Sequence, residues 1–417
     1  MSIREIHVNN IKSFKNVNLK LGNFNVFIGG NASGKTNFIS ILKFISYLKD
    51  YSFDDSLLML GGIEYFKNLS CPLLTESSIR VVSDTEELSH IPFLFTDSSF
   101  PDSLTISSKQ YKLTIDSSDI LFLKFREYLR LNCFFVDSEI GNRIITKLRS
   151  DLTHSNALHN IYISLSYING KLKIYTSMDN LNIDLLKIIL KGKAYESIFK
   201  NPNMTLLRKS AEFEKFSFYD FDPRLAKNAM PLSGKVELSE NGENLALVIN
   251  KILRKHDDHT KFITLIRELL PFITDLSISK LTDKSVHYIV QEKYFEKDYF
   301  HSSLISDGTA NILAIVIAIF FNDSDIIVIE EPEKNIHPYL LNKLIDLMKD
   351  ASRNKQIIIT THNPEIVKHA GIENLYLITR NNEGISDISK PASKKRVKMF
   401  LKEDMGLDDL YVENLLG

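Results

Sequence analysis

The residues from Gly29 to Asn37 have the types and spacing that bind a nucleotide polyphosphate. The stretch fits the pattern G-x-x-x-x-G-K-[ST], and its members are Gly29, Gly30, Asn31, Ala32, Ser33, Gly34, Lys35 and Thr36, followed by Asn37. Glycines let backbone amides wrap phosphates, the lysine reaches the β- and γ-phosphates, and the threonine hydroxyl ligates Mg²⁺. We therefore predict an ATP site, with Lys35 as a catalytic cation and Thr36 as a magnesium ligand. A glycine-rich turn with a chance Lys-Thr pair is the alternative.

Two consecutive glutamates follow an apolar strand. Residues 326–329 have the composition of a buried strand, and Glu330 and Glu331 come at its carboxyl end. Ligands of open α/β sheets collect at the carboxyl ends of the strands. We predict that Glu330 holds Mg²⁺ through water and that Glu331 polarises the attacking water. A solvated acidic turn is the alternative.

A histidine follows a second apolar strand. His362 comes directly after the stretch "QIIITT". From that position its side chain could contact the γ-phosphate and the attacking water, since imidazole exchanges protons near neutral pH. We predict a catalytic role for His362, and the alternative is a histidine that serves only the packing.

Four small polar residues precede the longest apolar run of the chain, Ile312 to Phe321. They are Ser306, Asp307, Gly308 and Thr309. Ser306 or Asp307 can cap a helix, while Gly308 allows close approach to amides that attract anions. Because this turn has no lysine or magnesium ligand of its own, we expect it to contact ATP bound to a second subunit. A plain helix cap is the alternative.

The elements that must position these residues follow from the hydrophobic pattern. A strand should end at residues 26–28 after a turn at Gly22-Asn23, and a helix should run from Lys35 to Leu48. Strands and helices alternate in the last third, which predicts a parallel sheet with both faces covered. "DLSISKL", "VHYIVQEKY" and 104–117 read as further strands, and Asn169-Gly170 as a hairpin turn. We divide the chain into an ATPase lobe (1–117), an inserted region (118–209) and a second ATPase lobe (210–417).

Composition limits the class of protein without identifying it. The chain has 417 residues, 44% of them hydrophobic and 25% charged, with a net charge of −1, so any basic surface must be local. Cys71 and Cys133 are the two cysteines, which excludes a thiolate metal cluster. The charged start does not fit a signal peptide, and Ile312 to Phe321 has about half the ~20 residues that a membrane helix needs. We expect a soluble cytoplasmic protein that does not associate with a membrane.

A basic stretch near the C-terminus has two interpretations. Its members are Lys390, Lys394, Lys395, Arg396, Lys398 and Lys402. It could contact DNA or a partner protein, but a solvated helix face is the simpler interpretation.

The motifs together resemble the ABC-type ATPases of the RecF/SMC class. The resemblance is closest to the standalone ATPases related to the ATPase half of OLD-family nucleases. It is carried by "VFIGGNASGKTNF", "SLISDGTANILAI", "IIVIEEPEKNIHP" and "IIITTHNPEIV", with "FYDFDP" and "NGENLALVI" as further similar segments. It implies an α/β P-loop fold, with a mixed sheet, covering helices, an antiparallel β subdomain and an inserted helical and hairpin region.

The resemblance also implies how the site is completed. Two chains would form a homodimer around two Mg-ATP, with the roles given above for Lys35, Thr36, Ser306, Gly308, Glu331 and His362. Lys12 and Ser13 match the turn near the nucleotide base, and residues 333–338 match the segment that crosses the dimer interface. Two features depart from the family. Glu330 replaces the aspartate of most ABC proteins, and the loop that usually supplies a glutamine stays unassigned, Gln110 being the only early glutamine.

Three functions remain open at this point. The first is a DNA-engaging motor or clamp like RecF or the SMC heads. The second is a sensor and regulatory scaffold, of dimeric or higher assembly, that controls a separate effector such as a nuclease in bacterial antiviral defence. The second is favoured because long heptad arms are missing and only 55 residues follow His362, too few for a Toprim nuclease domain. A P-loop kinase is the third, and it would give the Ser306–Thr309 turn no role.

Overall fold

The fold is known from a computed structural model, whose described part contains three β-sheets. The described residues are 2–51, 53–68, 70, 77–84, 108–116, 124–126, 128–132, 162–168, 171–176, 215–232, 237–282, 284–295, 297–403 and 405–416. Cys71, Cys133 and most of the inserted region lie outside them.

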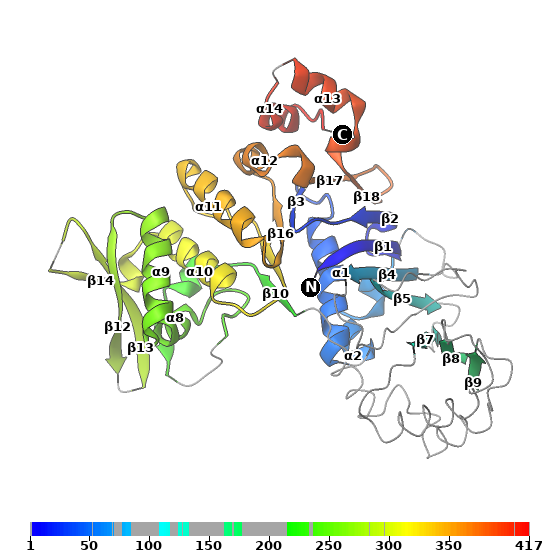
Figure 1. Ribbon diagram of the computed structural model, residues 1–417, viewed down its shortest axis with the longest axis horizontal. Helices are drawn as coiled ribbons and strands as arrows, with labels where there is room; N and C mark the ends of the chain where they lie inside the picture. The colour runs from blue at the N-terminus through cyan, green and yellow to red at the C-terminus, as the bar shows by residue number, and fades with distance from the viewer. Residues whose placement is uncertain are drawn as a thin grey trace, which may run out of the picture.

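The main sheet combines strands from both ends of the chain (Figure 1). Its order is β10-β15-β16-β3-β17-β18-β2-β1-β4-β5-β6. The strands are β1 (Ile3–Ile11), β2 (Phe14–Lys20), β3 (Phe24–Ile28), β4 (Ser77–Asp84), β5 (Ser108–Asp116), β6 (Lys124–Arg126), β10 (Phe216–Tyr219), β15 (Ile326–Glu330), β16 (Gln356–Thr361), β17 (Leu375–Arg380) and β18 (Ser386–Ser389). The pairs from β10 to β17 are parallel, whereas those from β2 to β6 are antiparallel. The sheet is therefore mixed, as predicted.

The parallel strands bury both of their faces, in two separate cores. Val26 of β3 and Ile327 of β15 face one core, which also contains the helices of the second lobe. Phe27 and Val328, one residue along each strand, face the other core together with Phe38 of α1. Alternate residues of a strand point to opposite faces, and helices on both faces make both sets apolar. This explains why these strands read as continuous apolar runs.

Helices cover the main sheet, and further helices lie between it and the smaller sheet that contains β12 (Ile273–Thr282) and β13 (Ser285–Glu292) (Figure 1). They are α1 (Lys35–Asp50), α2 (Phe53–Leu58), α3 (Ile63–Phe66), α7 (Pro223–Ala226), α8 (Leu245–Leu253), α9 (His256–Leu269), α10 (Asp307–Phe320), α11 (Pro338–Ala351), α12 (Pro364–Ala370), α13 (Lys395–Lys402) and α14 (Leu407–Val412). Every residue of α10 from Thr309 to Ile319 is buried, because the helix is apolar all round and is enclosed on all sides. Among the described residues, no helix combines the length and apolarity needed to span a bilayer.

Two smaller antiparallel sheets complete the described fold. One contains β11 (Met230–Pro231), β12 (Ile273–Thr282), β13 (Ser285–Glu292) and β14 (Tyr299–His301), and α8 and α9 pack on it (Figure 1). The other contains β7 (Tyr128–Asn132), β8 (Tyr162–Ile168) and β9 (Lys171–Thr176), within the inserted region. β8 and β9 pair antiparallel, with Ile168 opposite Lys171, and the turn predicted at Asn169-Gly170 lies outside the described residues.

The predicted fold class is confirmed, as is the predicted helix from Lys35. One local expectation is refined, since the turn at Gly22-Asn23 separates two strands that do not pair with each other: β2 lies between β1 and β18, and β3 lies between β16 and β17. Gln110 pairs with Val82 in the backbone of the sheet, but its side chain lies outside the described part. The boundaries at residues 117 and 209 stay predictions.

Candidate functional site

The glycines of the loop between β3 and α1 are needed for different physical reasons. A Cβ on Gly29 would lie 2.5 Å from the carbonyl oxygen of Ile378, and one on Gly34 would lie 2.6 Å from Ser386 Oγ. Gly34 also has a φ of 120°, which other residues rarely adopt. A Cβ on Gly30 would meet nothing within 4 Å, because Gly30 faces open space. Two glycines therefore let the loop pack against β17 and β18, and the third leaves its outer face clear for a ligand.

The start of α1 is suited to bind an anion. Its N-cap is Gly34, so no side chain accepts from the amides of the first turn. Lys35 Nζ donates to the carbonyls of Gly29 and Gly30, at 2.7 Å and 3.0 Å. Burial lowers the pKa of Lys35, while the charges of Glu331 and Glu333 raise it. The ammonium thus lies over the loop, on the side where the glutamates are, and Thr36 is exposed beside it.

Residues far away in the sequence hold the loop in shape. Ser386 Oγ donates to the carbonyl of Ser33 at 2.7 Å, and the Ser386 amide donates to the carbonyl of Ser13 at 2.7 Å. Asn37 Nδ2 donates to Ser13 Oγ at 2.9 Å. Arg380 Nη1 donates to the carbonyl of Ala32 at 3.4 Å. Sequence reasoning missed Ser386 and Arg380, since the hairpin that carries them has no motif.

The predicted base-binding turn divides into two parts. Ser13 Oγ accepts from Asn37 of α1 and its carbonyl accepts from Ser386, whereas the ammonium of Lys12 lies 5.9 Å from the centre of the Phe66 ring. Lys12 also has a φ of 53°, and burial lowers its pKa. Ser13 thus supports the loop through Ser386 and α1, and a contact of Lys12 with a nucleotide stays a prediction.

Glu330 lies on the face of the sheet that α1 covers. It continues the alternation of Ile326 and Val328, which share a core with α1. Burial raises the pKa of Glu330; the charge of Asp220 adds to this, and Lys43 and Lys334 oppose it. Asp220 follows β10, the parallel neighbour of β15. The first glutamate is therefore surrounded by charged side chains, and sequence reasoning missed Asp220 as one of them.

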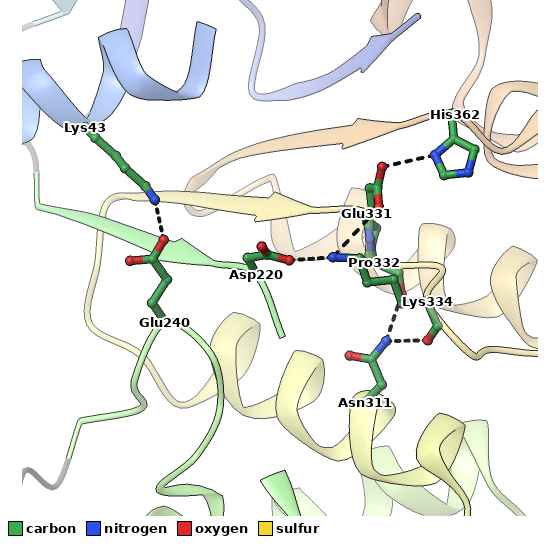
Figure 2. A network of polar contacts seen from close by, with 8 residues as sticks. All are labelled: Lys43, Asp220, Glu240, Asn311, Glu331, Pro332, Lys334 and His362. Atoms are coloured by element: carbon green, nitrogen blue, oxygen red, sulfur yellow. Dashed lines mark hydrogen bonds and ion pairs between the residues drawn. The ribbon is translucent and has the colours of Figure 1, made fainter. Parts of the chain in front are cut away.

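Glu331 and His362, each predicted from its position after an apolar strand, lie close together (Figure 2). Glu331 Oε1 lies 3.0 Å from His362 Nδ1, and Glu331 Oε2 lies 3.8 Å from Lys334 Nζ. The Glu331 backbone has a φ of 46°, and its amide donates to the carbonyl of Thr360 at 2.8 Å. The carboxylate is thus fixed by contacts from both β16 and its own loop. A carboxylate held in this way can accept a proton from a water molecule.

Glu333 is a third carboxylate near the lysine. It is 8% exposed, and Thr361 Oγ1 donates to its Oε1 at 2.5 Å, while its Oε2 is buried without a partner. Burial is the main cause of its raised pKa, which the hydrogen bond from Thr361 and the charge of His362 oppose. Glu333 therefore adds negative charge beside Lys35.

The Ser306–Thr309 turn is capped within its own chain. Ser306 Oγ accepts from the Thr309 amide at 3.1 Å, so Ser306 is the N-cap of α10. Asp307 Oδ1 forms an ion pair with Lys227 Nζ at 2.5 Å. A Cβ on Gly308 would collide with the carbonyl oxygen of Asn335. The cap interpretation is thus correct for Ser306, and Gly308 is required by close backbone packing.

Asn311 ties α10 to the loop that follows Glu331 (Figure 2). It is 1% exposed, and its Nδ2 donates to the carbonyl of Lys334 at 2.7 Å and to that of Pro332 at 3.3 Å. Lys334 Nζ in turn pairs with Asp220 at 2.5 Å. Together with the Gly308–Asn335 contact, this makes α10 and residues 332–335 one packed unit. Sequence reasoning missed Asn311, because it lies inside an apolar helix.

The residues fit Mg-ATP as a ligand. The start of α1 has no side-chain cap, and the lysine lies over the loop. No group of three His, Cys, Asp or Glu side chains forms a metal cage in the described part of the chain. None is expected, because Mg²⁺ in such sites is held by one or two side chains, water and the phosphates themselves. Thr36 and Glu330 remain the predicted magnesium ligands.

Several members of the basic stretch are engaged within the chain. Lys394 Nζ donates to the carbonyl of Leu416 at 3.2 Å, and the Lys390 ammonium lies 5.1 Å from the centre of the Tyr376 ring. The Arg396 guanidinium lies 5.4 Å from the centre of the Phe400 ring. These contacts favour a structural interpretation for this part of the surface.

Comparisons with known proteins agree with this geometry. A family described as "AAA domain, putative AbiEii toxin, Type IV TA system" matches residues 24–368, from β3 past His362. The chain is 23% identical over 384 residues to a protein named Endonuclease GajA of Bacillus cereus (strain VD045); the match covers 88% of this chain and 56% of that protein. The chain thus spans little more than half the length of this relative.

A solved structure supports the fold. It is a crystal structure of the SmcHead bound to the C-winged helix domain of ScpA, with a TM-score of 0.50 and 11% identity. The likeness covers 93% of this chain and 98% of that one. The fold is accordingly that of an SMC head.

Proposed function

We propose that the chain hydrolyses ATP as a dimer closed around two ATP molecules. The chain belongs to the AAA-domain family whose model matches residues 24–368. The observation that carries the proposal is the fixed position of Glu331. His362, Lys334 and the backbone of Thr360 all contact this residue, and Lys35 is its charge neighbour. A carboxylate and a lysine placed in this way can act on the same terminal phosphate.

Each residue has one role in the proposed reaction. Lys35 and the free amides at the start of α1 bind the β- and γ-phosphates. Glu331 orients the attacking water and accepts its proton, and His362 holds the carboxylate and lies near the departing phosphate. Mg²⁺ bound with the nucleotide, through Thr36 and Glu330, would neutralise phosphate charge. The Ser306–Thr309 turn would contact the γ-phosphate of ATP bound to the other chain.

Trapping the dimer tests this proposal. Glu331→Gln keeps the shape of the side chain but removes its basicity, so this variant should bind ATP, hydrolyse it at least about 100-fold more slowly, and elute as a dimer. The wild type should return to monomers as ATP is consumed. Unchanged hydrolysis by Glu331→Gln would remove the catalytic assignment.

Mixing two inactive chains tests the shared site. Lys35→Ala disables the phosphate loop, and Ser306→Arg blocks the turn, so neither chain should hydrolyse ATP alone. In an equal mixture half of the dimers are mixed, and each of them holds one intact centre. We expect about one quarter of the wild-type rate. An inactive mixture, beside a wild-type monomer that hydrolyses ATP, would exclude the dimeric site.

We propose further that the ATP cycle controls a separate effector in bacterial antiviral defence. The relation to a protein named as an endonuclease supports a role near nucleic acid, and the match covers 56% of that protein. Co-purification of an effector in the presence of ATP, insensitive to DNase, is the expected result. ATPase stimulation by duplex DNA with a steep salt dependence would instead favour a DNA-engaging clamp.

A further inference from the structure

The turn that is proposed to meet the partner's ATP carries a negative charge. Asp307 is the first residue of α10, and its side chain is 37% exposed. A carboxylate at a helix start favours the helix, but it repels any anion that approaches the same amides. The turn can therefore accept a polyphosphate only if the charge of Asp307 is balanced.

Lys227 is placed to balance that charge. Its Nζ lies 2.5 Å from Asp307 Oδ1 and donates to the carbonyl of Ile305 at 3.4 Å. At its other end, the carbonyl of Lys227 accepts from Ser302 Oγ at 2.7 Å. The side chain is 18% exposed. Both ends of Lys227 are thus attached to the segment that leads into the turn, so the ammonium is held beside the turn in advance.

The charges around the turn show what Lys227 adds. A polar hollow of about 380 Å³ beside the turn is lined by Asp220, Asp222 and Asp307 and by two cations, Arg224 and Lys334. Lys334 already pairs with Asp220 at 2.5 Å. Lys227 is not part of this lining, but it pairs with Asp307 and so balances the third carboxylate. Without Lys227, two cations would face three carboxylates, and the hollow would carry an excess negative charge next to the turn. A polyphosphate would then be repelled.

We propose that Lys227 is a positioning residue of the half-site that meets the partner's ATP. It neutralises Asp307, and the amides of the turn then accept the terminal phosphate. This inference rests on the dimer proposed above. It assigns a role to a residue outside every motif of the sequence.

Charge substitutions in the Glu331→Gln chain test the role. The quantity to measure is the ATP concentration at which half of the chains are dimeric, determined by mass photometry. Lys227→Met should raise it at least about tenfold, an effect that shrinks as salt increases, while Lys227→Arg should leave it within about threefold. Lys227→Met combined with Asp307→Asn should also return to within about threefold, because the repelling charge is gone.

Several outcomes would overturn the proposal. They are a Lys227→Met chain that dimerises at the reference ATP concentration, a double variant that stays as weak as Lys227→Met, and an Asp307→Asn chain that needs more ATP than the reference. Lys215→Met is the matched control, since it breaks an exposed pair with Glu237 at 3.5 Å and should change nothing. ATP binding to the monomer and the unfolding midpoint report whether each variant is folded.

The failure of the inference differs from the failure of the proposed function. If the Glu331→Gln chain itself stays monomeric with ATP, the dimeric mechanism is wrong and the role of Lys227 falls with it. If that chain dimerises and Lys227→Met dimerises equally well, only the role of Lys227 is wrong.

Discussion

The two helix starts that carry the predicted phosphate contacts, at α1 and at α10, are built in opposite ways. At α1 the N-cap is Gly34, no side chain covers the first amides, and Gly30 faces open space. At α10 the N-cap is Ser306, whose hydroxyl accepts from an amide of its own turn, and Asp307 adds a charge that Lys227 balances. The start of α1 therefore offers uncapped amides to an anion, whereas the start of α10 can accept an anion only when Lys227 balances the charge of Asp307.

The two helix starts also pack against different parts of the molecule. Gly29 and Gly34 pack against β17 and β18, two strands in the middle of the main sheet. Gly308 packs against Asn335, in the loop that follows Glu331, and Asn311 holds the same loop. The start of α10 is therefore packed against the loop that carries Glu331 of the same chain, while the start of α1 is packed against strands of the main sheet.

The largest expected difference between the two starts is in ATP binding by the monomer. Lys35→Ala should weaken it at least about 100-fold, or about 2.8 kcal/mol, since charge-assisted contacts to phosphate are lost. Ser306→Ala should leave it unchanged, because the hydroxyl contacts Thr309 alone in this half-site. Calorimetry at chain concentrations below dimerisation measures both. Equal losses of ATP affinity in the two variants would show that both helix starts contribute to one site of the monomer.

A smaller difference is expected when a methyl group is added to each start. Gly308→Ala would press a Cβ against the carbonyl of Asn335, and overpacking of this kind costs about 1–3 kcal/mol of stability. Gly30→Ala meets open space and should change the free energy of unfolding by less than about 0.5 kcal/mol. Urea unfolding compares the two. A neutral Gly308→Ala would show that the loop after Glu331 is free to move away from α10.

The cap at α10 should contribute about 1 kcal/mol. Ser306→Ala removes the acceptor for the Thr309 amide and should lower the free energy of unfolding by that amount. Ser306→Thr keeps an acceptor at the same position and should retain most of the stability. If Thr lost as much as Ala, the hydroxyl would not be the cause.

The smallest expected effect is a change with pH in the stability of the folded chain, caused by Glu333 in the loop that follows Glu331. Burial raises the pKa of Glu333, which is a charge neighbour of Lys35 and lies two residues before Asn335. A raised carboxyl pKa stabilises the folded chain below the unfolded pKa of about 4.3, and this contribution is lost as pH rises through the folded pKa. Glu333→Gln should therefore gain melting temperature relative to the wild type as pH rises above about 4.3, which melting curves across the pH range measure. A difference in melting temperature that does not change with pH would contradict the assignment.

Sequence reasoning located the site better than it described the site's internal contacts. Glu331 and His362 are each predicted from a position after an apolar strand, and in the structure Glu331 Oε1 lies 3.0 Å from His362 Nδ1. The sequence predicts that the Ser306–Thr309 turn contacts the partner's phosphate. Within its own chain the turn is capped by Ser306 and its Asp307 pairs with Lys227. Asp220 and Asn311 lie inside segments that carry the resemblance, and Lys227 lies outside them. None of the three has a spacing that predicts its contacts, since a lone polar residue gives no periodic signal.

Local patterns in the sequence are enough to predict a phosphate site and to identify the class of fold. Phosphate binding needs glycines and a lysine at fixed short spacing, and buried parallel strands need continuous apolar runs, so both leave local patterns. The distant groups that surround the predicted site are known only from the folded chain. Ser386 lies 353 residues from Ser33, and Lys227 lies 80 residues from Asp307. Such pairs leave no local pattern, because only the folded chain brings the two groups together.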